Sequence, residues 1–347
     1  MKRLTAFIMA IIMFFLFGFS SVNAIEQQPT AGDVTDASDL SAELIREVIN
    51  TIHGAVGSVY GILGKDCPVC GKIHKETGAS EVKEDVIKRY KAALCDTKYI
   101  LHALGGMENA HTYTNSIDAL KACYAEGYRF FEVDISFTSD DKLVCAHSST
   151  VNGVENVWKK ADWTKRLGQK YDPNHPFASY EEFMSFKIQG KFKATSFAEI
   201  VEFMAGHNDM YLMLDIGYRS YNGTKKIYEA IVDTAKGNTD VLNRFIAGGH
   251  SINMMKAVAE VYDFPLLNLY FAAKASRQEA LKEPEDFVAY CLENGVTSFS
   301  TSCATFGSED MSLLSANLIG YVFTTDSSLD ALKIHRQRFV VGTNFLR

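Results

Sequence analysis

The sequence lacks any cluster of lysine and arginine residues, and its formal net charge is −7. Without such a cluster, the protein has no positively charged surface that would bind the phosphates of a nucleic acid, so we expect no nucleic acid partner. The acidic balance also disfavours adsorption to anionic lipid surfaces, although single lipid molecules can still be attacked.

The sequence also lacks an apolar run of roughly 20 residues, the length that a bilayer-spanning helix needs. A shorter apolar run, Ala6 to Phe19, follows two basic residues and precedes Ala24, with a small residue two places earlier. This pattern predicts a cleaved signal peptide over residues 1–24 rather than an uncleaved membrane anchor. No cysteine follows the run directly, so a lipoprotein anchor is not indicated. We expect a secreted or periplasmic protein with no stable membrane anchor after cleavage.

The seven cysteines make an odd number in a chain that is expected to leave the reducing cytosol, so at least one lies outside an intramolecular disulfide. Cys67, Cys70 and His74, with Cys95 downstream, have a spacing that suits a structural zinc ion. The same residues suit a disulfide between Cys67 and Cys70, or between Cys70 and Cys95. Both interpretations stay open.

Two helices are expected before any strand. Residues 25–40 read as a flexible lead-in, and helices follow over residues 42–63 and from about 82 to 94. We interpret residues 25–97 as an N-terminal helical extension, a helical hairpin packed on the domain of residues 98–347.

Short β-rich runs then alternate with helix-length spacers, which indicates an α/β protein with a (β/α)₈ TIM barrel. Thr195 or Ser196 is expected to cap a helix, with Glu199 at the capping-box position. Of the eight runs, the first two end at Ala103 and Ile135. The other six are Tyr211 to Ile216, Arg244 to Ala247, Leu266 to Phe271, Thr297 to Thr301, Ile319 to Thr324 and Phe339 to Val341.

The segment from His102 to His147 contains most of the candidate catalytic residues of the chain. Glu132 and Asp134 lie two apart on an expected strand, so their carboxylates point to one face. Such carboxylates either repel each other or hold a hard cation such as Ca²⁺ or Mg²⁺. A metal ion flanked by two histidines suits phosphodiester cleavage.

This segment resembles the signature of the glycerophosphodiester phosphodiesterase family, and the resemblance extends over about residues 98–347. His147 stands fifteen positions after Glu132, as in that family. The resemblance implies a metal-dependent hydrolase that cleaves glycerophosphodiesters or related lipid head-group diesters to an alcohol and a phosphomonoester such as glycerol 3-phosphate. The matching elements are His102, Glu108-Asn109, Glu132-Val133-Asp134, Thr138-Ser139-Asp140 and His147.

The resemblance also implies roles for individual residues. Glu132, Asp134 and Asp215 would be the metal ligands, although the family usually has a glutamate where this chain has the shorter Asp215. His102 and His147 would be the acid/base pair, and the sequence does not determine which is the acid. In the family, residues 148–193 would form a loop or small insertion above the barrel mouth.

The chain departs from the family pattern at two cationic positions. The family has an arginine directly after the first histidine and a lysine two places after the third carboxylate, whereas this chain has Ala103 and Gly217. The transition state still needs positive charge near its phosphoryl oxygens. Glu108 would either lie near the metal or cap the following helix. The candidates for substrate binding are therefore Glu108, Arg219, His250 and Lys274.

Two other functions compete with this prediction. A metal-free phosphoinositide-type phospholipase C lyase uses the same barrel, but it would leave three carboxylates without a cation. A catalytically weak barrel that acts as a binding protein would explain Ala103 and Gly217, but it would not explain the two histidines.

Overall fold

The computed structural model describes residues 77–95, 97–107, 111–337 and 339–344. The expected signal peptide, the helix over 42–63, the cluster of Cys67, Cys70 and His74, the side chain of Cys95, and Glu108 lie outside the described residues. The described chain falls almost wholly into one compact unit, Gly78–Arg347. Among its helices, none is both long and apolar enough to cross a membrane.

Eight parallel strands form a closed barrel, as the sequence predicts, because β1 pairs with both β13 and β2. Strand β8 has the expected bounds, and the bounds of the other strands differ from the expected ones by one to a few residues. The barrel strands are β1 (Tyr99–Leu101), β2 (Phe130–Phe137), β8 (Tyr211–Ile216), β9 (Phe245–Gly249), β10 (Leu266–Tyr270), β11 (Ser298–Ser302), β12 (Ile319–Phe323) and β13 (Val340–Thr343).

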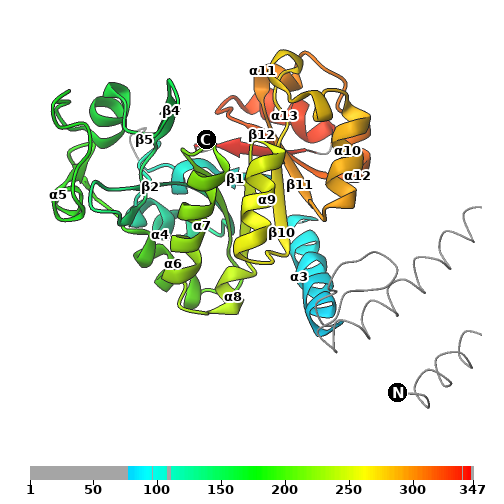
Figure 1. Ribbon diagram of the computed structural model, residues 1–347, viewed down its shortest axis with the longest axis horizontal. Helices are drawn as coiled ribbons and strands as arrows, with labels where there is room; N and C mark the ends of the chain where they lie inside the picture. The colour runs from blue at the N-terminus through cyan, green and yellow to red at the C-terminus, as the bar shows by residue number, and fades with distance from the viewer. Residues whose placement is uncertain (1–76, 96, 108–110, 338, 345–347) are drawn as a thin grey trace, which may run out of the picture. The chain divides into compact units, whose positions relative to one another are not determined.

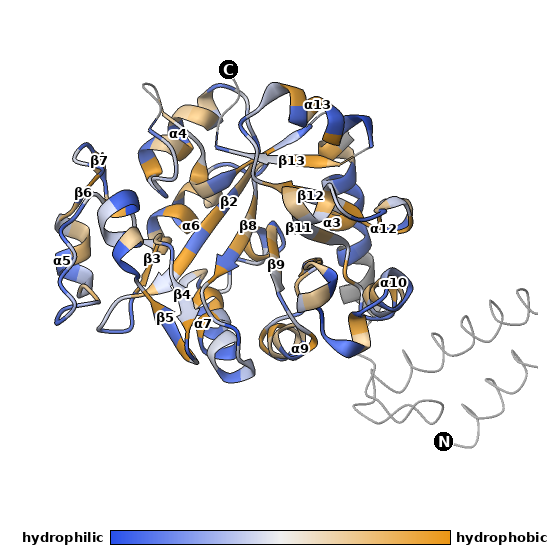
Figure 2. Ribbon diagram, turned by 90° about the horizontal axis from the view of Figure 1, so that it is seen from above, coloured by the Kyte–Doolittle hydropathy of each residue, from blue (hydrophilic) through white to orange (hydrophobic). Residues whose placement is uncertain are grey.

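Amphipathic helices surround the barrel and bury their apolar faces against the strands, as the hydropathy colours of Figure 2 show. Serine side chains cap several of them, and Ser196 with Glu199 forms the expected capping box. The helices are α4 (Ile117–Ala125), α6 (Phe197–Ala205), α7 (Tyr221–Thr234), α8 (Thr239–Leu242), α9 (Ile252–Val261), α10 (Pro284–Glu293), α11 (Cys303–Phe306), α12 (Ser312–Asn317) and α13 (Ser328–Arg336).

Helix α3 (Thr77–Cys95) closes the end of the barrel where the strands begin. Val86, Tyr90 and Leu94 are buried against the first residues of several strands, among them Phe130 and Tyr211. The Tyr90 hydroxyl forms a buried hydrogen bond with that of Tyr321 on β12. In Figure 1, α3 and the hairpin β4–β5 (Ser149–Val151 and Val154–Val157) lie at opposite ends of the barrel. Helix α3 therefore belongs to the barrel's compact unit, which begins earlier than the expected boundary at residue 98.

The insertion over residues 148–193 is more ordered than the sequence indicates. It packs around its own apolar cluster, in which Trp158 and Trp163 are buried. Its elements are too short to give a hydrophobic period, which explains why the sequence suggested a loop. They are the hairpin β4–β5, the π-helix η3 (Asp162–Leu167), α5 (Tyr180–Ser185) and the hairpin β6–β7 (Lys187–Ile188 and Phe192–Lys193), and β3 (Leu143–Val144) precedes them.

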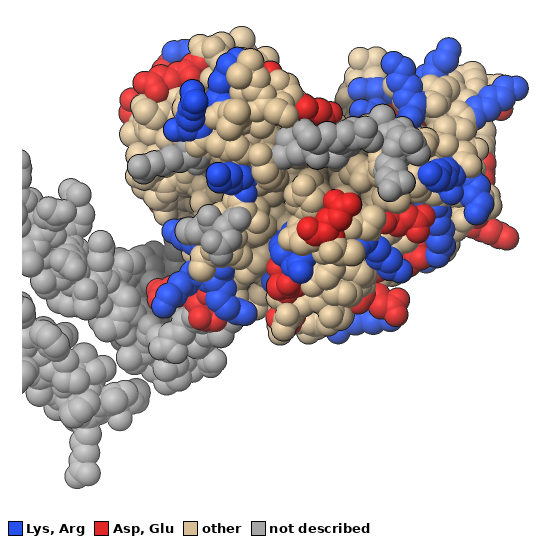
Figure 3. All heavy atoms as spheres, turned by 180° about the vertical axis from the view of Figure 1, so that it is seen from behind, with Lys and Arg blue, Asp and Glu red and all other residues tan. Residues whose placement is uncertain are grey.

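The charged side chains of the folded unit are mixed in sign. On the face that Figure 3 shows, lysine and arginine side chains occur together with aspartate and glutamate. Many of them form surface ion pairs, such as Lys226 with Asp141 at 2.7 Å and Lys225 with Glu260 at 3.1 Å.

Candidate active site

Three carboxylates converge at the end of the barrel where the strands finish. Glu132 and Asp134 lie on β2, and Asp215 lies on the neighbouring strand β8 in register with Asp134. One oxygen from each lies within 4.8 Å of the other two. Glu132 and Asp134 are each only 3% exposed, whereas Asp215 is partly exposed. The alternation of side chains along β2 thus produces the pair of carboxylates that the sequence predicted.

The cluster is electrostatically unfavourable without a cation. Burial, reinforced by the charges of Asp134 and Asp215, raises the pKa of Glu132 well above its usual range. Burial also raises the pKa of Asp134. Burial opposes ionisation of Asp215 as well, but the neighbouring His250 and Arg219 lower its pKa to about 2.

The donor set fits a hard divalent cation. Glu132 Oε1 is buried and has no hydrogen-bond partner among the described residues. A buried carboxylate oxygen without a donor is costly, and a cation would satisfy it. Three carboxylates are ligands of the kind that Ca²⁺ and Mg²⁺ prefer.

His102 lies directly after β1, and Asn344 beyond β13 orients its ring. The distance from His102 Nδ1 to Asn344 Oδ1 is 3.0 Å. The Asn344 amide nitrogen donates to Asp326 at 2.9 Å, which leaves the amide oxygen to accept from the histidine. His102 therefore donates from Nδ1, and its Nε2 lies 3.8 Å from Glu132 Oε2.

His147 is oriented by a buried carboxylate instead. Its Nδ1 lies 2.8 Å from Oδ1 of Asp162, which is 2% exposed. Arg166 donates to the same oxygen at 2.5 Å, and the backbone N–H of Lys159 donates to Oδ2 at 2.7 Å. Burial acts to lower the pKa of His147, but the hydrogen bond to Asp162 and the charge of Asp134 outweigh it and raise that pKa.

Tyr113 and Asn115 complete the centre of the site. The Tyr113 ring lies 4.5 Å from the ring of His102 and 6.0 Å from that of His147, measured between centroids. Asn115 donates from Nδ2 to Asp134 Oδ2 at 2.8 Å and accepts from the Asp134 backbone N–H at 3.1 Å. Asn115 thereby orients a carboxylate of the cluster. Sequence reasoning missed both residues, because they lie in a polar segment without a periodic pattern.

Two cavities adjoin the carboxylate cluster, and His147 lines one while His102 lines the other. Asp215 lines both cavities. The larger, of about 260 Å³, is lined by Asp134, His147, Ser148, Lys159 and Arg219, among others. The smaller, of about 140 Å³, is lined by His102, Glu132, His250, Tyr270 and Phe323, among others.

Sequence comparison gives a family for this arrangement. The model of the glycerophosphoryl diester phosphodiesterase family matches residues 106–337. The chain belongs to this family. Its members are phosphoric diester hydrolases, and the barrel and its acidic cluster agree with that class. No curated protein matches the chain in sequence.

Solved structures of family members share the barrel. A glycerophosphodiester phosphodiesterase from Parabacteroides distasonis has a TM-score of 0.51 and 14% identity, with 72% of this chain and 92% of that chain covered. An Oleispira antarctica phosphodiesterase, solved with the product sn-glycerol-3-phosphate, has a TM-score of 0.52 and 12% identity, with 73% and 95% covered. Identities this low indicate a common fold.

The departure from the family pattern at Gly217 has a steric basis. A Cβ atom at Gly217 would overlap Ser148 Oγ and lie 2.8 Å from the Ser148 backbone carbon. Thr150 Oγ1 also donates to the Gly217 carbonyl at 2.8 Å. The start of the insertion thus occupies the space that a lysine at this position would need.

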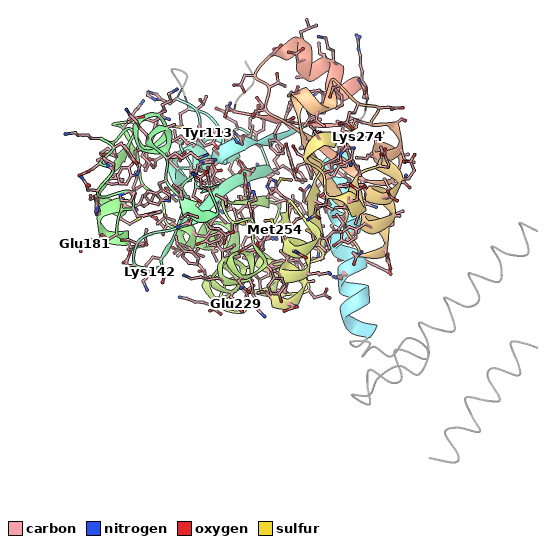
Figure 4. All side chains as sticks on the ribbon, turned by 45° about the horizontal axis from the view of Figure 1, so that its top comes forward. Tyr113, Lys142, Glu181, Glu229, Met254 and Lys274 are labelled. Carbon is pink, nitrogen blue, oxygen red and sulfur yellow. The ribbon has the colours of Figure 1, made fainter. Side chains whose placement is uncertain are left out.

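The predicted substrate-binding residues lie at different distances from the cluster. Arg219 lines the larger cavity, and His250 Nε2 lies 4.0 Å from Asp215 Oδ1. Lys274, in the turn η4 (Lys274–Ser276), forms an ion pair with Glu283 at 2.7 Å, and Figure 4 shows it well away from Tyr113. A substrate role for these residues stays a prediction.

Proposed function

We propose that this family member is an exported, metal-dependent phosphodiesterase that hydrolyses glycerophosphodiesters or related lipid head-group diesters. The observation that carries the proposal is a cluster of three carboxylates with a histidine on each side, His102 and His147. The products would be an alcohol and a phosphomonoester. The Oleispira antarctica structure with sn-glycerol-3-phosphate supports glycerol 3-phosphate as that monoester.

The two histidines divide the proton transfers. The Asp162 carboxylate favours the protonated form of His147, so His147 suits the acid that gives a proton to the leaving alkoxide. His102 has the neutral Asn344 amide at Nδ1, which leaves its Nε2 free to accept a proton from the attacking water. In this proposal, the two cavities would receive the entering and leaving groups on different sides of the cluster.

Glu132, Asp134 and Asp215 would hold the cation, Ca²⁺ or Mg²⁺. When bound there, a divalent cation supplies positive charge to the phosphoryl oxygens. Asn115 keeps the Asp134 carboxylate oriented, and the Ala103 backbone N–H does the same for Glu132 at 2.7 Å. Export rests on the pattern of residues 1–24. The alternatives of a zinc ion or a disulfide near Cys67 and Cys70 both stay predictions.

The test is a panel of substrates with the metal varied. Glycerophosphocholine, glycerophosphoethanolamine, glycerophosphoglycerol and lysophosphatidylcholine would each be incubated with the protein in EDTA, Ca²⁺ or Mg²⁺. We expect metal-dependent release of a phosphomonoester, measured by ³¹P NMR. Full turnover in EDTA with a cyclic phosphate as the final product would favour the metal-free lyase. Binding of diesters without turnover would favour the binding protein.

A further inference from the structure

The larger cavity is lined by two cationic side chains that form no ion pair with a carboxylate of the described residues. Lys159 and Arg219 line it together with Asp134 and Asp215 of the cluster. Within the part of the chain that the structure describes, no carboxylate oxygen lies within 4.0 Å of a side-chain nitrogen of Lys159 or Arg219. Both cations are therefore available to an anion that enters the cavity.

The Arg219 guanidinium is held in place without losing its charge. Its Nη1 donates to the backbone carbonyls of Ile216 and Tyr218 at 2.6 and 2.7 Å. These acceptors are neutral, so the full positive charge remains at the cavity.

The hairpin β4–β5 is anchored on the loop after β8, and Lys159 lies two residues after the end of this hairpin. Glu155 on β5 accepts from the backbone N–H groups of Arg219 and Ser220, both at 2.6 Å. The backbone N–H of Lys159 donates to Asp162, the residue that orients His147. These bonds tie the position of Lys159 to that of the histidine.

A third polar group in the same cavity lacks a partner. Ser148 is 6% exposed, and its hydroxyl has no hydrogen-bond partner among the described residues. Leaving a buried hydroxyl without a partner is unfavourable, and an entering oxygen acceptor would satisfy it. Two unpaired cations and one unpaired donor suit a phosphate group and repel a cationic one.

We propose that Lys159 and Arg219, with the Ser148 hydroxyl, bind the anionic oxygens of the scissile phosphate on the His147 side of the carboxylate cluster. The inference rests on the proposed function and adds the residues that bind its phosphate. They replace the cationic side chains that Ala103 and Gly217 do not provide. Lys159 comes from the insertion, an element in which sequence reasoning found no candidate.

The test compares Lys159→Met and Arg219→Met with Lys160→Met in the full chain. Lys160 is the matched control, because it is exposed and adjacent to Lys159 but does not line the cavity. Steady-state kinetics would use glycerophosphoglycerol, with a neutral head group, and glycerophosphocholine, with a cationic one. Inhibition by glycerol 3-phosphate and calorimetric binding of inorganic phosphate provide readouts that need no turnover.

For Lys159→Met and Arg219→Met we expect kcat/KM to fall by roughly 10- to 100-fold on both substrates, the range for a lost charge-assisted hydrogen bond. Affinity for phosphate and for glycerol 3-phosphate should weaken by a similar factor. Lys159→Arg should recover much of the loss, and Lys160→Met should match the wild type.

Unchanged kinetics and unchanged phosphate affinity in both variants would overturn the inference and leave the proposed function intact. A loss confined to one head group would also overturn it, because the cations would then contact the head group. If the wild type cleaved no diester, the proposed function would fail. Phosphate binding would still decide the inference, since a loss in Lys159→Met supports it and equal affinity overturns it.

Discussion

At the scale of single residues, the two histidines differ in what their Nδ1 atoms contact. His147 contacts a buried carboxylate, Asp162, whereas His102 contacts the neutral amide of Asn344. A carboxylate partner stabilises the imidazolium form, and an amide oxygen does so much less. The same side-chain type is thereby suited to opposite proton transfers.

Replacing either histidine with alanine should therefore stop proton transfer without unfolding the barrel. We expect His102→Ala and His147→Ala to lower kcat by about 10²- to 10⁴-fold, the usual range for general acid/base groups. Turnover of glycerophosphoglycerol would be measured beside circular dichroism. His175→Ala is a suitable control, because this histidine is exposed and pairs with Glu182 on the surface. Near wild-type turnover in both active-site variants would contradict the mechanism.

The pH profile should depend on Asp162. An acid works only while protonated, so activity falls as the pH rises through the pKa of His147. Asp162 raises that pKa against the effect of burial. In Asp162→Asn the pKa of His147 should drop, so the alkaline limb of kcat against pH should move to lower pH.

Asp172→Asn is the control for this shift, since Asp172 is an exposed carboxylate in the same insertion. The melting temperatures of both variants would show whether the fold is intact. An alkaline limb that stays in place in folded Asp162→Asn would mean that His147 is not the acid.

At the scale of elements, α3 acts as a plug for the barrel. It contributes Val86, Tyr90 and Leu94 to an apolar cluster built from the first residues of the strands. Barrel interiors must be filled by side chains, and here a helix from outside the repeat fills one end. At the opposite end, the insertion brings Lys159 and Asp162 to the site.

Tyr90 is the side chain whose loss should weaken this plug most, because it is fully buried and bonded to Tyr321. Tyr90→Ala should lower the free energy of unfolding by about 3–5 kcal/mol, as for other large buried aromatic residues. Urea denaturation would measure it. Lys91→Ala, exposed on the same helix, should change the free energy by less than about 0.5 kcal/mol. Equal stability of the two variants would show that α3 does not support the barrel.

At the scale of the whole molecule, the carboxylate cluster links metal binding to stability. The raised pKa values of Glu132 and Asp134 mean that the metal-free fold favours their protonated forms. The two protonated carboxyl groups therefore contribute to the stability of the fold below the pKa values that they have in the unfolded chain. This stabilisation is lost as the pH rises through their pKa values in the folded protein. A cation binds the ionised forms and should restore stability at neutral pH.

We therefore expect saturating Ca²⁺ or Mg²⁺ to raise the melting temperature of EDTA-treated protein. At a hundredfold excess of the ion over Kd, the free energy of unfolding should gain about 2.7 kcal/mol. The gain should shrink as the pH falls, because protons compete for the carboxylates. Glu132→Gln and Asp134→Asn should abolish the gain and the activity together. Differential scanning calorimetry at two pH values would measure the melting temperature with and without the ion. A melting temperature that did not respond to either ion would remove the metal from the mechanism.

The sequence by itself determined the barrel and the core of the site. Alternation along a strand places Glu132 and Asp134 on one face, and the order of the strands places Asp215 beside them. The pair on the strand follows from local periodicity, whereas Asp215 was predicted from the family resemblance and its place in the order of the strands. The helix capped by Ser196 was predicted from another local signal, a capping residue followed by Glu199 at the capping-box position.

Only the tertiary structure decided which residues orient and charge the site. Asn344 lies 242 positions after His102, and Asp162 sits in an insertion without periodicity. Contacts of this kind depend on how distant segments pack, and a polar residue in an irregular segment has no local signal of its partner. The closure of the barrel by α3 and the arrival of Lys159 at the cavity have the same cause, since each depends on packing between segments that are not neighbours in the chain.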